Sequence, residues 1–160
     1  MKSKLMSPST PSEKAQQAIL RHMAAGAVAG LLPLPWIGFA ALTAVQLNML
    51  RHLASIYDVS FSKEIGASAI GALVGSDLSL SLSLGIAKLL PGPSIPLAVV
   101  SGGLLGSAST FALGKVFIQH FESGNTFLTF DPEKVRAYYQ EQFTRVTTSK
   151  EPGNFTGIRP

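Results

Sequence analysis

The side chains whose types could do chemistry are three histidines, His22, His52 and His120, and Asp77, an acid that lies within a long apolar stretch. Histidine binds metal ions and moves protons near neutral pH. Two of these histidines directly follow an arginine, which is a poor neighbour for a bound cation, and no carboxylate stands at a ligand spacing from any of them. Solvent-facing histidines are therefore the favoured interpretation, and no metal site is predicted.

Asp77 is open to two interpretations. It is the single charged residue in the apolar stretch 65–87, and ionisable residues in such stretches often belong to functional sites. It also follows Gly75-Ser76, where it could simply cap a local interruption of a helix. The chain has no cysteine, no phosphate-binding glycine loop and no nucleophile elbow, so we predict no catalytic residue, no cofactor and no enzyme activity.

The two Arg-His pairs flank the stretch around which the chain is organised. Arg21-His22 precedes and Arg51-His52 follows a run, 23–50, that has no charged residue and is broken by Pro33 and Pro35. Proline removes a backbone donor and clashes with the preceding turn, so the run is typical of two helices folded back on each other. Both pairs then lie at the end away from an apolar tip. With Lys115 they form a predicted basic collar that could bind lipid phosphates or an acidic partner, the alternative being a merely solvated ring.

A second apolar hairpin follows the first. The arms 65–87 and 95–114 are each about 20 residues long, enough to span a bilayer, and three prolines and a glycine force a turn between them. The stretch 77–84 alternates apolar and polar residues like a strand. We predict a helix there because a lone strand among helices would leave its backbone unpaired.

Glycines recur four residues apart in the apolar arms, a spacing that lets helix backbones approach closely. These predicted packing positions are Gly26 and Gly30, Gly71 and Gly75, and Gly102 and Gly106.

The last predicted helix, 131–145, is amphipathic. Asp131-Pro132-Glu133 supplies a cap, a first-turn proline and an acidic first turn. Val135, Tyr139 and Phe143 form one apolar stripe, which either packs on the hairpins or docks a protein partner.

The predicted organisation is thus an all-α fold of two proline-tipped antiparallel hairpins inserted in a membrane, 10–57 and 61–122, and the amphipathic helix. Together these make one helical domain, 10–145, between tails at 1–9 and 146–160.

Charge supports a membrane environment. Charged residues make up 14% of the chain, against about 25% in ordinary soluble domains. Of the 13 Lys and Arg residues all but Lys88 fall on the tail-bearing side, which predicts cytoplasmic termini. The N-terminus has no apolar core typical of a secretory signal. A formal net charge of +4, scattered along the chain, does not favour nucleic acid as a partner.

Several blocks of sequence resemble one bacterial family. They are Arg21-His22, Gly30 to Pro35, Ala40 to Leu50, Gly114 to Ile118, His120 to Gly124 and Phe130 to Val135. Over about 15–145 the chain resembles the YcjF-like family, domain of unknown function 697. That resemblance implies an association with the bacterial inner membrane and, in some members, a genetic or fused link to a P-loop GTPase.

Three functions follow as hypotheses. The first is a membrane anchor or partner for a cytoplasmic GTPase or similar assembly. The second is a module that binds or remodels lipid by itself. The third is a soluble interaction domain that forms a homo-oligomer through its apolar tips.

Overall fold

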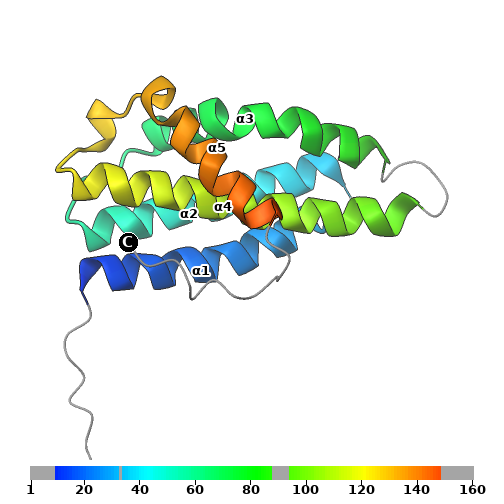
Figure 1. Ribbon diagram of the computed structural model, residues 1–160, viewed down its shortest axis with the longest axis horizontal. Coiled ribbons are helices and arrows are strands. Elements are labelled where there is room, and N and C mark those ends of the chain that lie inside the picture. Colours follow the sequence, from blue (N-terminus) through cyan, green and yellow to red (C-terminus); the bar gives the residue numbers. More distant parts are fainter. Residues whose placement is uncertain (1–9, 33, 88–93, 149–160) are drawn as a thin grey trace, which may run out of the picture.

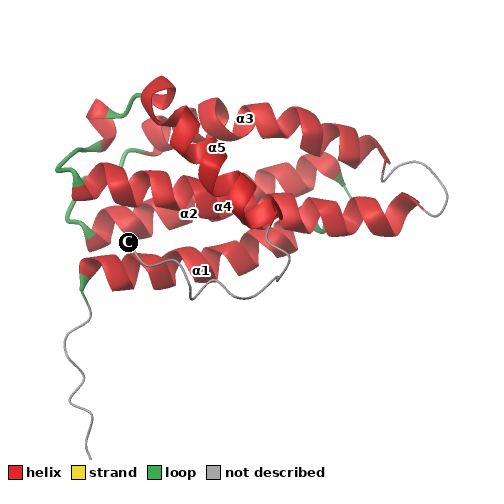
Figure 2. Cartoon of the chain, viewed as in Figure 1, coloured by secondary structure: helices red, strands yellow, loops and turns green. Residues whose placement is uncertain are grey.

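Four long helices lie side by side and a fifth crosses them obliquely (Figures 1 and 2). The computed structural model describes residues 10–32, 34–87 and 94–148, and within these ranges it describes all side chains except those of residues 35 and 76–101. The elements are α1 (Pro11–Gly30), α2 (Pro35–Ile56), α3 (Lys63–Ala87), α4 (Ser94–Glu122), the short 3₁₀ helix η1 (Phe127–Thr129) and α5 (Pro132–Thr148). Since the described ranges contain no strand, the all-α prediction is confirmed.

Both α1 and α5 begin with side-chain caps, the second at the Asp131-Pro132-Glu133 start predicted from the sequence. At α1 the backbone N–H of Glu13 donates to Thr10 Oγ1 at 3.2 Å, and the N–H of Thr10 donates to the Glu13 carboxylate at 3.0 Å, which is a complete capping box. At α5 the N–H of Glu133 donates to Asp131 Oδ1 at 3.1 Å. Proline occupies the first turn of both helices, where its missing N–H costs nothing.

Breaks between helices also follow the sequence. α1 ends at Gly30, before the two prolines, and α2 begins at Pro35. α4 ends before Gly124, whose φ of 77° is the left-handed conformation that glycine adopts without steric cost. The alternating stretch 77–84 lies inside α3, as predicted.

The bundle has two distinct ends. At one end, which we call the tip end, α1 passes into α2 through residues 31–34, and α3 finishes near the start of α4 (Figure 1). At the opposite end, the open end, lie the start of α1, the α2–α3 connection and the α4–α5 connection (Figure 1). Among the residues that the structure describes, α4 contacts α1, α2, α3 and α5, and its largest interface there is with α1 rather than with its own hairpin partner α3.

The buried apolar side chains that the structure describes lie mostly in the open half of the bundle. Its fully buried side chains include Ile19, Met49, Leu73, Leu113 and Phe117. Phe127 and Phe130 fold back from the α4–α5 connection onto Phe117, with the Phe117 and Phe130 rings stacked at 4.6 Å between centroids. This aromatic cluster fixes η1 and hence the start of α5 to the end of α4.

Among the described residues no helix combines the length and the apolar character that a membrane crossing needs. Membrane insertion of the hairpins therefore stays a prediction.

Candidate functional site

Large apolar side chains are exposed at the tip end. The exposed fraction is 62% for Val28 and 65% for Trp36. We call the whole group the apolar tip; its members are Val28, Leu31, Leu34, Trp36, Ile37, Phe39 and, on α4, Leu104. Large apolar side chains gathered in an exposed position at one end of a fold are typical of a site of interaction with a membrane, a protein or a ligand.

A belt of small residues separates the apolar tip from the polar part of α1 and α2. The exposed positions there are Ala24, Ala25, Ala40 and Ala44. The only hydroxyl on this surface is that of Thr43, which donates to the carbonyl of Phe39 at 2.9 Å. The belt therefore offers the outside neither charge nor an unpaired side-chain donor.

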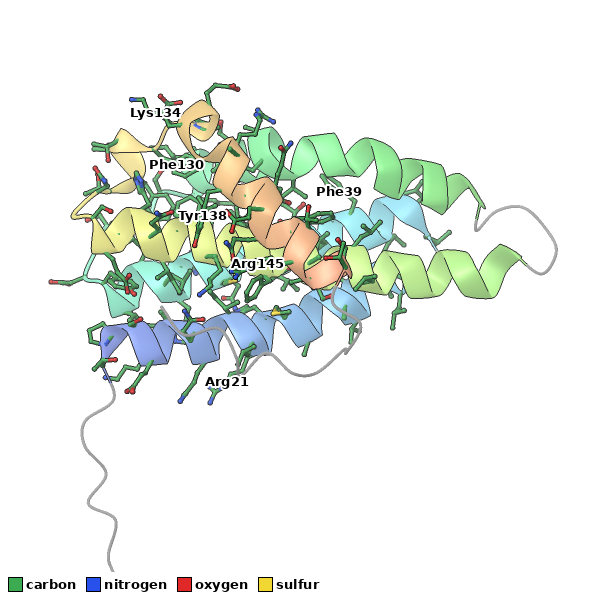
Figure 3. All side chains as sticks on the ribbon, viewed as in Figure 1. Arg21, Phe39, Phe130, Lys134, Tyr138 and Arg145 are labelled. Carbon is green, nitrogen blue, oxygen red and sulfur yellow. The ribbon has the colours of Figure 1, made fainter. Side chains whose placement is uncertain are left out.

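The predicted collar forms where α1 meets α2. His22 Nδ1 lies 2.7 Å from the Ala18 carbonyl, so it donates, and His22 Nε2 accepts from Asn48 Nδ2 at 3.2 Å. The ring of His52 lies against that of His22, with centroids 6.1 Å apart. The structure thus brings both Arg-His pairs to one level of the bundle. The Arg21 side chain points outward from α1, away from the rest of the bundle (Figure 3).

The two arginines differ in their surroundings. Arg21 is exposed on α1. The Arg51 guanidinium lies over the ring of Phe61 at 5.2 Å from its centroid, a cation–π contact that holds the charge near the α2–α3 connection. Both charges stay accessible from outside the bundle.

Lys115 lies apart from this cluster, on the face of α4 that α5 covers. Its Nζ is 5.9 Å from the Phe111 ring centroid. Burial lowers the pKa of Lys115, the nearby charge of Arg145 lowers it further, and Glu122 partly opposes both. Gly114, beside it, packs against Ile19, so Lys115 is near the level of the collar while facing α5.

The glycines of α1 and α4 meet directly. A Cβ on Gly26 would lie 2.8 Å from the carbonyl oxygen of Gly106, and a Cβ on Gly30 would overlap the carbonyl of Gly102. The helix backbones can approach this closely only because no side chain intervenes. Gly71 and Gly75 on α3 differ, since a Cβ on either would have no heavy atom within 4 Å.

The apolar stripe of α5 is used within the chain. Tyr139 is 1% exposed, and Val135 and Phe143 pack partly buried against the core. The neighbouring Gln142 and Val146 are buried too. Burial of this face means that, in this conformation, the stripe holds α5 on the bundle and is not open to a partner.

Two polar contacts were not anticipated from the sequence. Gln46 is fully buried and donates to Ser109 Oγ at 3.1 Å, linking α2 to α4. The Tyr57 hydroxyl donates to Glu122 Oε1 at 2.7 Å, and burial together with that bond raises the Tyr57 pKa. Gln46 follows the buried face of α2 and could have been found by that periodicity. Tyr57 and Glu122 are too far apart in the chain to give any such signal.

The predicted chemistry-bearing residues do not form a metal site in the described part of the chain. No group of three or more His, Cys, Asp or Glu side chains could hold an ion there. His120 bonds the Thr126 carbonyl at 2.9 Å and touches the aromatic cluster. The side chain of Asp77, and with it the choice between its two interpretations, lies outside the described residues.

Comparison with known proteins places this arrangement in a family. Residues 2–148 match the family model described as domain of unknown function DUF697. A relative, magnetosome membrane protein 22 of Magnetospirillum gryphiswaldense, is 32% identical over 135 residues, which cover 82% of this chain and 69% of the relative. No solved structure matches. The chain belongs to the DUF697 family.

Proposed function

We propose that this chain is a non-enzymatic helical protein of the bacterial inner membrane that anchors a cytoplasmic partner there, a P-loop GTPase or a similar assembly. One observation carries the membrane part of the proposal, namely the apolar tip, with its exposed Trp36 and Val28. Burying such surface in lipid yields about 25 cal/mol per Å².

The comparisons also support a membrane location. The relative from Magnetospirillum gryphiswaldense is named as a membrane protein, and the chain shares its family with it at 32% identity. The basic collar lies on the same side of the apolar tip as the two termini, which are predicted to be cytoplasmic. Clusters of cations beside an apolar surface suit the anionic headgroups of a cytoplasmic leaflet.

The GTPase partner is proposed from the family resemblance alone. Because α5 uses Tyr139 to hold itself on the bundle, a partner has to use another surface of the open half. Leu128, which is 84% exposed on η1, is one apolar residue available there.

The membrane part is tested by fractionating bacterial cells that express the full chain or a variant. Ile37→Glu places a charge in the apolar tip and should move the protein from the membrane pellet to the supernatant. Leu128→Glu is the matched control, because it places the same charge on an exposed leucine at the open end and should leave the protein in the pellet. If both variants remain in the pellet, the tip is not the membrane-binding surface.

The anchoring part needs a second measurement. Co-purification in mild detergent, followed by mass spectrometry, should recover a nucleotide-binding protein with the wild-type chain and with Ile37→Glu. Recovery of lipid and no protein would instead support the alternative of a lipid-binding or membrane-remodelling module. A discrete oligomer that Ile37→Glu dissociates in detergent-free buffer would support the soluble interaction domain.

A further inference from the structure

We propose that the α1–α2 hairpin enters only one leaflet of an anionic bilayer, with its apolar tip near the bilayer midplane and its collar among lipid phosphates. The inference rests on the proposed membrane association and specifies its depth and its lipid class.

The depth follows from the level at which α1 and α2 become polar. The hydrogen bond between His22 and Asn48 and the contact between His22 and His52 define that level on both helices. Leu31 lies about 14 Å beyond His22 along α1, and Trp36 lies about 18 Å beyond Asn48 along α2. The hydrocarbon of one leaflet is about 15 Å thick and that of a whole bilayer about 30 Å.

The surface between these levels suits the interior of a leaflet. The exposed positions of the small-residue belt are alanines, and Thr43 bonds its hydroxyl back to the carbonyl of Phe39. Gln46, the other polar side chain in this part of α2, is buried and donates to Ser109 inside the bundle. Of the side-chain donors on the inserted surface, the hydroxyl of Thr43 and the amide of Gln46 therefore already have partners inside the protein, and the indole N–H of Trp36 is the donor that meets the lipid.

Charge identifies the lipid. Arg21 and Arg51 lie at the polar level, and 23–50 contains no charged residue. The Arg21 side chain points outward from α1 (Figure 3), and Arg51 is exposed beside Phe61. Two cations around an uncharged hairpin complement a layer of phosphate groups, each basic residue near such a surface contributing about 1 kcal/mol. A second copy of the chain would bring the same cations together, which makes it the less suitable occupant.

Trp36 provides the test, because it is the single tryptophan of the chain and lies in the apolar tip. The full-length protein is diluted from detergent onto preformed phosphatidylcholine vesicles with or without phosphatidylglycerol. Binding is measured by co-sedimentation, and depth by quenching of Trp36 fluorescence with lipids brominated near the carboxyl end or near the methyl end of the acyl chain. Iodide trapped inside the vesicles reports arrival at the far side.

The inference predicts preferential binding to the anionic vesicles, quenching that is strongest with the deep bromines, and no quenching by trapped iodide. Quenching by trapped iodide, or stronger quenching by the shallow bromines, would mean that the tip has crossed or lies flat, and would overturn the one-leaflet arrangement. Vesicle binding with Trp36 still in water would overturn this inference and leave the proposed membrane association standing. Failure to co-sediment with either vesicle would overturn both.

The lipid class has its own variants. Arg21→Gln combined with Arg51→Gln should weaken partitioning onto the anionic vesicles by about tenfold or more at low salt, and the difference should shrink as salt is added. Lys134→Gln, which removes a cation from the exposed surface of α5, is the matched control and should have no effect. Equal partitioning of the double variant and the wild type would refute headgroup binding by the collar, provided that circular dichroism shows both to be folded.

Discussion

Alanine at Gly30 and alanine at Gly71 should change stability in opposite directions. In a helix, replacing glycine by alanine stabilises by about 1 kcal/mol, because glycine loses more backbone entropy on folding. At Gly71 that gain is expected in full, since a Cβ would have no heavy atom within 4 Å. At Gly30 the new Cβ would overlap the carbonyl of Gly102 and lie 2.6 Å from its carbon and 3.1 Å from the nitrogen of Gly103.

The obstacle at Gly30 is backbone, which cannot turn aside as the end of a side chain can. Overpacking of a well-packed contact costs about 1–3 kcal/mol, and rigid backbone favours the upper end of that range. Subtracting the gain in helix propensity leaves a net destabilisation of about 2 kcal/mol for Gly30→Ala. For a chain of this size that is a fall in melting temperature of about 4–8 °C, against a rise of about 2–4 °C for Gly71→Ala.

Thermal unfolding followed by circular dichroism at 222 nm, in one mild detergent for all variants, measures both shifts. Equal stabilisation by the two substitutions would refute the close approach of α1 and α4. A fall of equal size for both would refute the account of Gly71 as an open position.

Three further predictions concern polar side chains. Burial, together with the bond to Glu122, raises the pKa of Tyr57, so its neutral phenol stabilises the fold below pH 10 and this contribution is lost as pH rises further. Tyr57→Phe should flatten the loss of stability above pH 10 in urea titrations. An unchanged slope would exclude ionisation of Tyr57 as the source of that loss. Burial and the nearby charge of Arg145 lower the pKa of Lys115, so its ammonium destabilises the fold, and stability rises with pH as the folded protein loses this proton. Lys115→Met should raise the melting temperature at pH 7 and remove the gain in stability at alkaline pH. A lower melting temperature at pH 7 would contradict this explanation. Gln142 is 2% exposed, and its Oε1 has no hydrogen-bond partner among the residues that the structure describes. Gln142→Met should therefore be neutral or stabilising by up to about 1–2 kcal/mol in chemical denaturation. A loss of stability above about 1 kcal/mol would show that the amide has a needed partner.

Local signals in the sequence were enough to place the helices. Thr10 with Glu13, and Asp131 before a proline, carry the chemistry that caps a helix, and the structure uses both. Pro33 and Pro35 separate α1 from α2 for an equally local reason, the missing donor and the steric clash of the ring. Such features depend on a few neighbouring residues and are independent of how the helices pack.

Pairing between helices could not be obtained in the same way. The glycine spacing in α1 predicted a close contact but did not say that α4 would supply the other side. α1 was expected beside α2, and its largest interface is with α4. The choice depends on how Gly26 and Gly30 fit the bare backbone around Gly106, which is a property of two surfaces and not of either sequence alone.

The candidate site was likewise predictable only in those parts that depend on local sequence. Arg21 and Arg51 could be assigned to one end of a hairpin because the fold-back alone brings them there. The hydrogen bond from Asn48 to His22 could not be foreseen, since it depends on the rotation of each helix about its axis. Lys115 was expected in the collar from its position along α4, but it faces α5, because a position along a helix does not determine the side on which the residue lies.

The interface between α1 and α4 joins helices that are far apart in the sequence. Gly30 of α1 packs against Gly102 of α4, and both α2 and α3 lie between these two helices in the sequence. Among the described residues this is also the most extensive helix pair. Loop closure of that length has to be achieved before the contact returns any free energy, which slows folding. During synthesis α1 and α2 leave the ribosome first. The first hairpin therefore leaves the ribosome with the face of α1 that contains Gly26 and Gly30 uncovered, and this face is completed only when α4 has been synthesised.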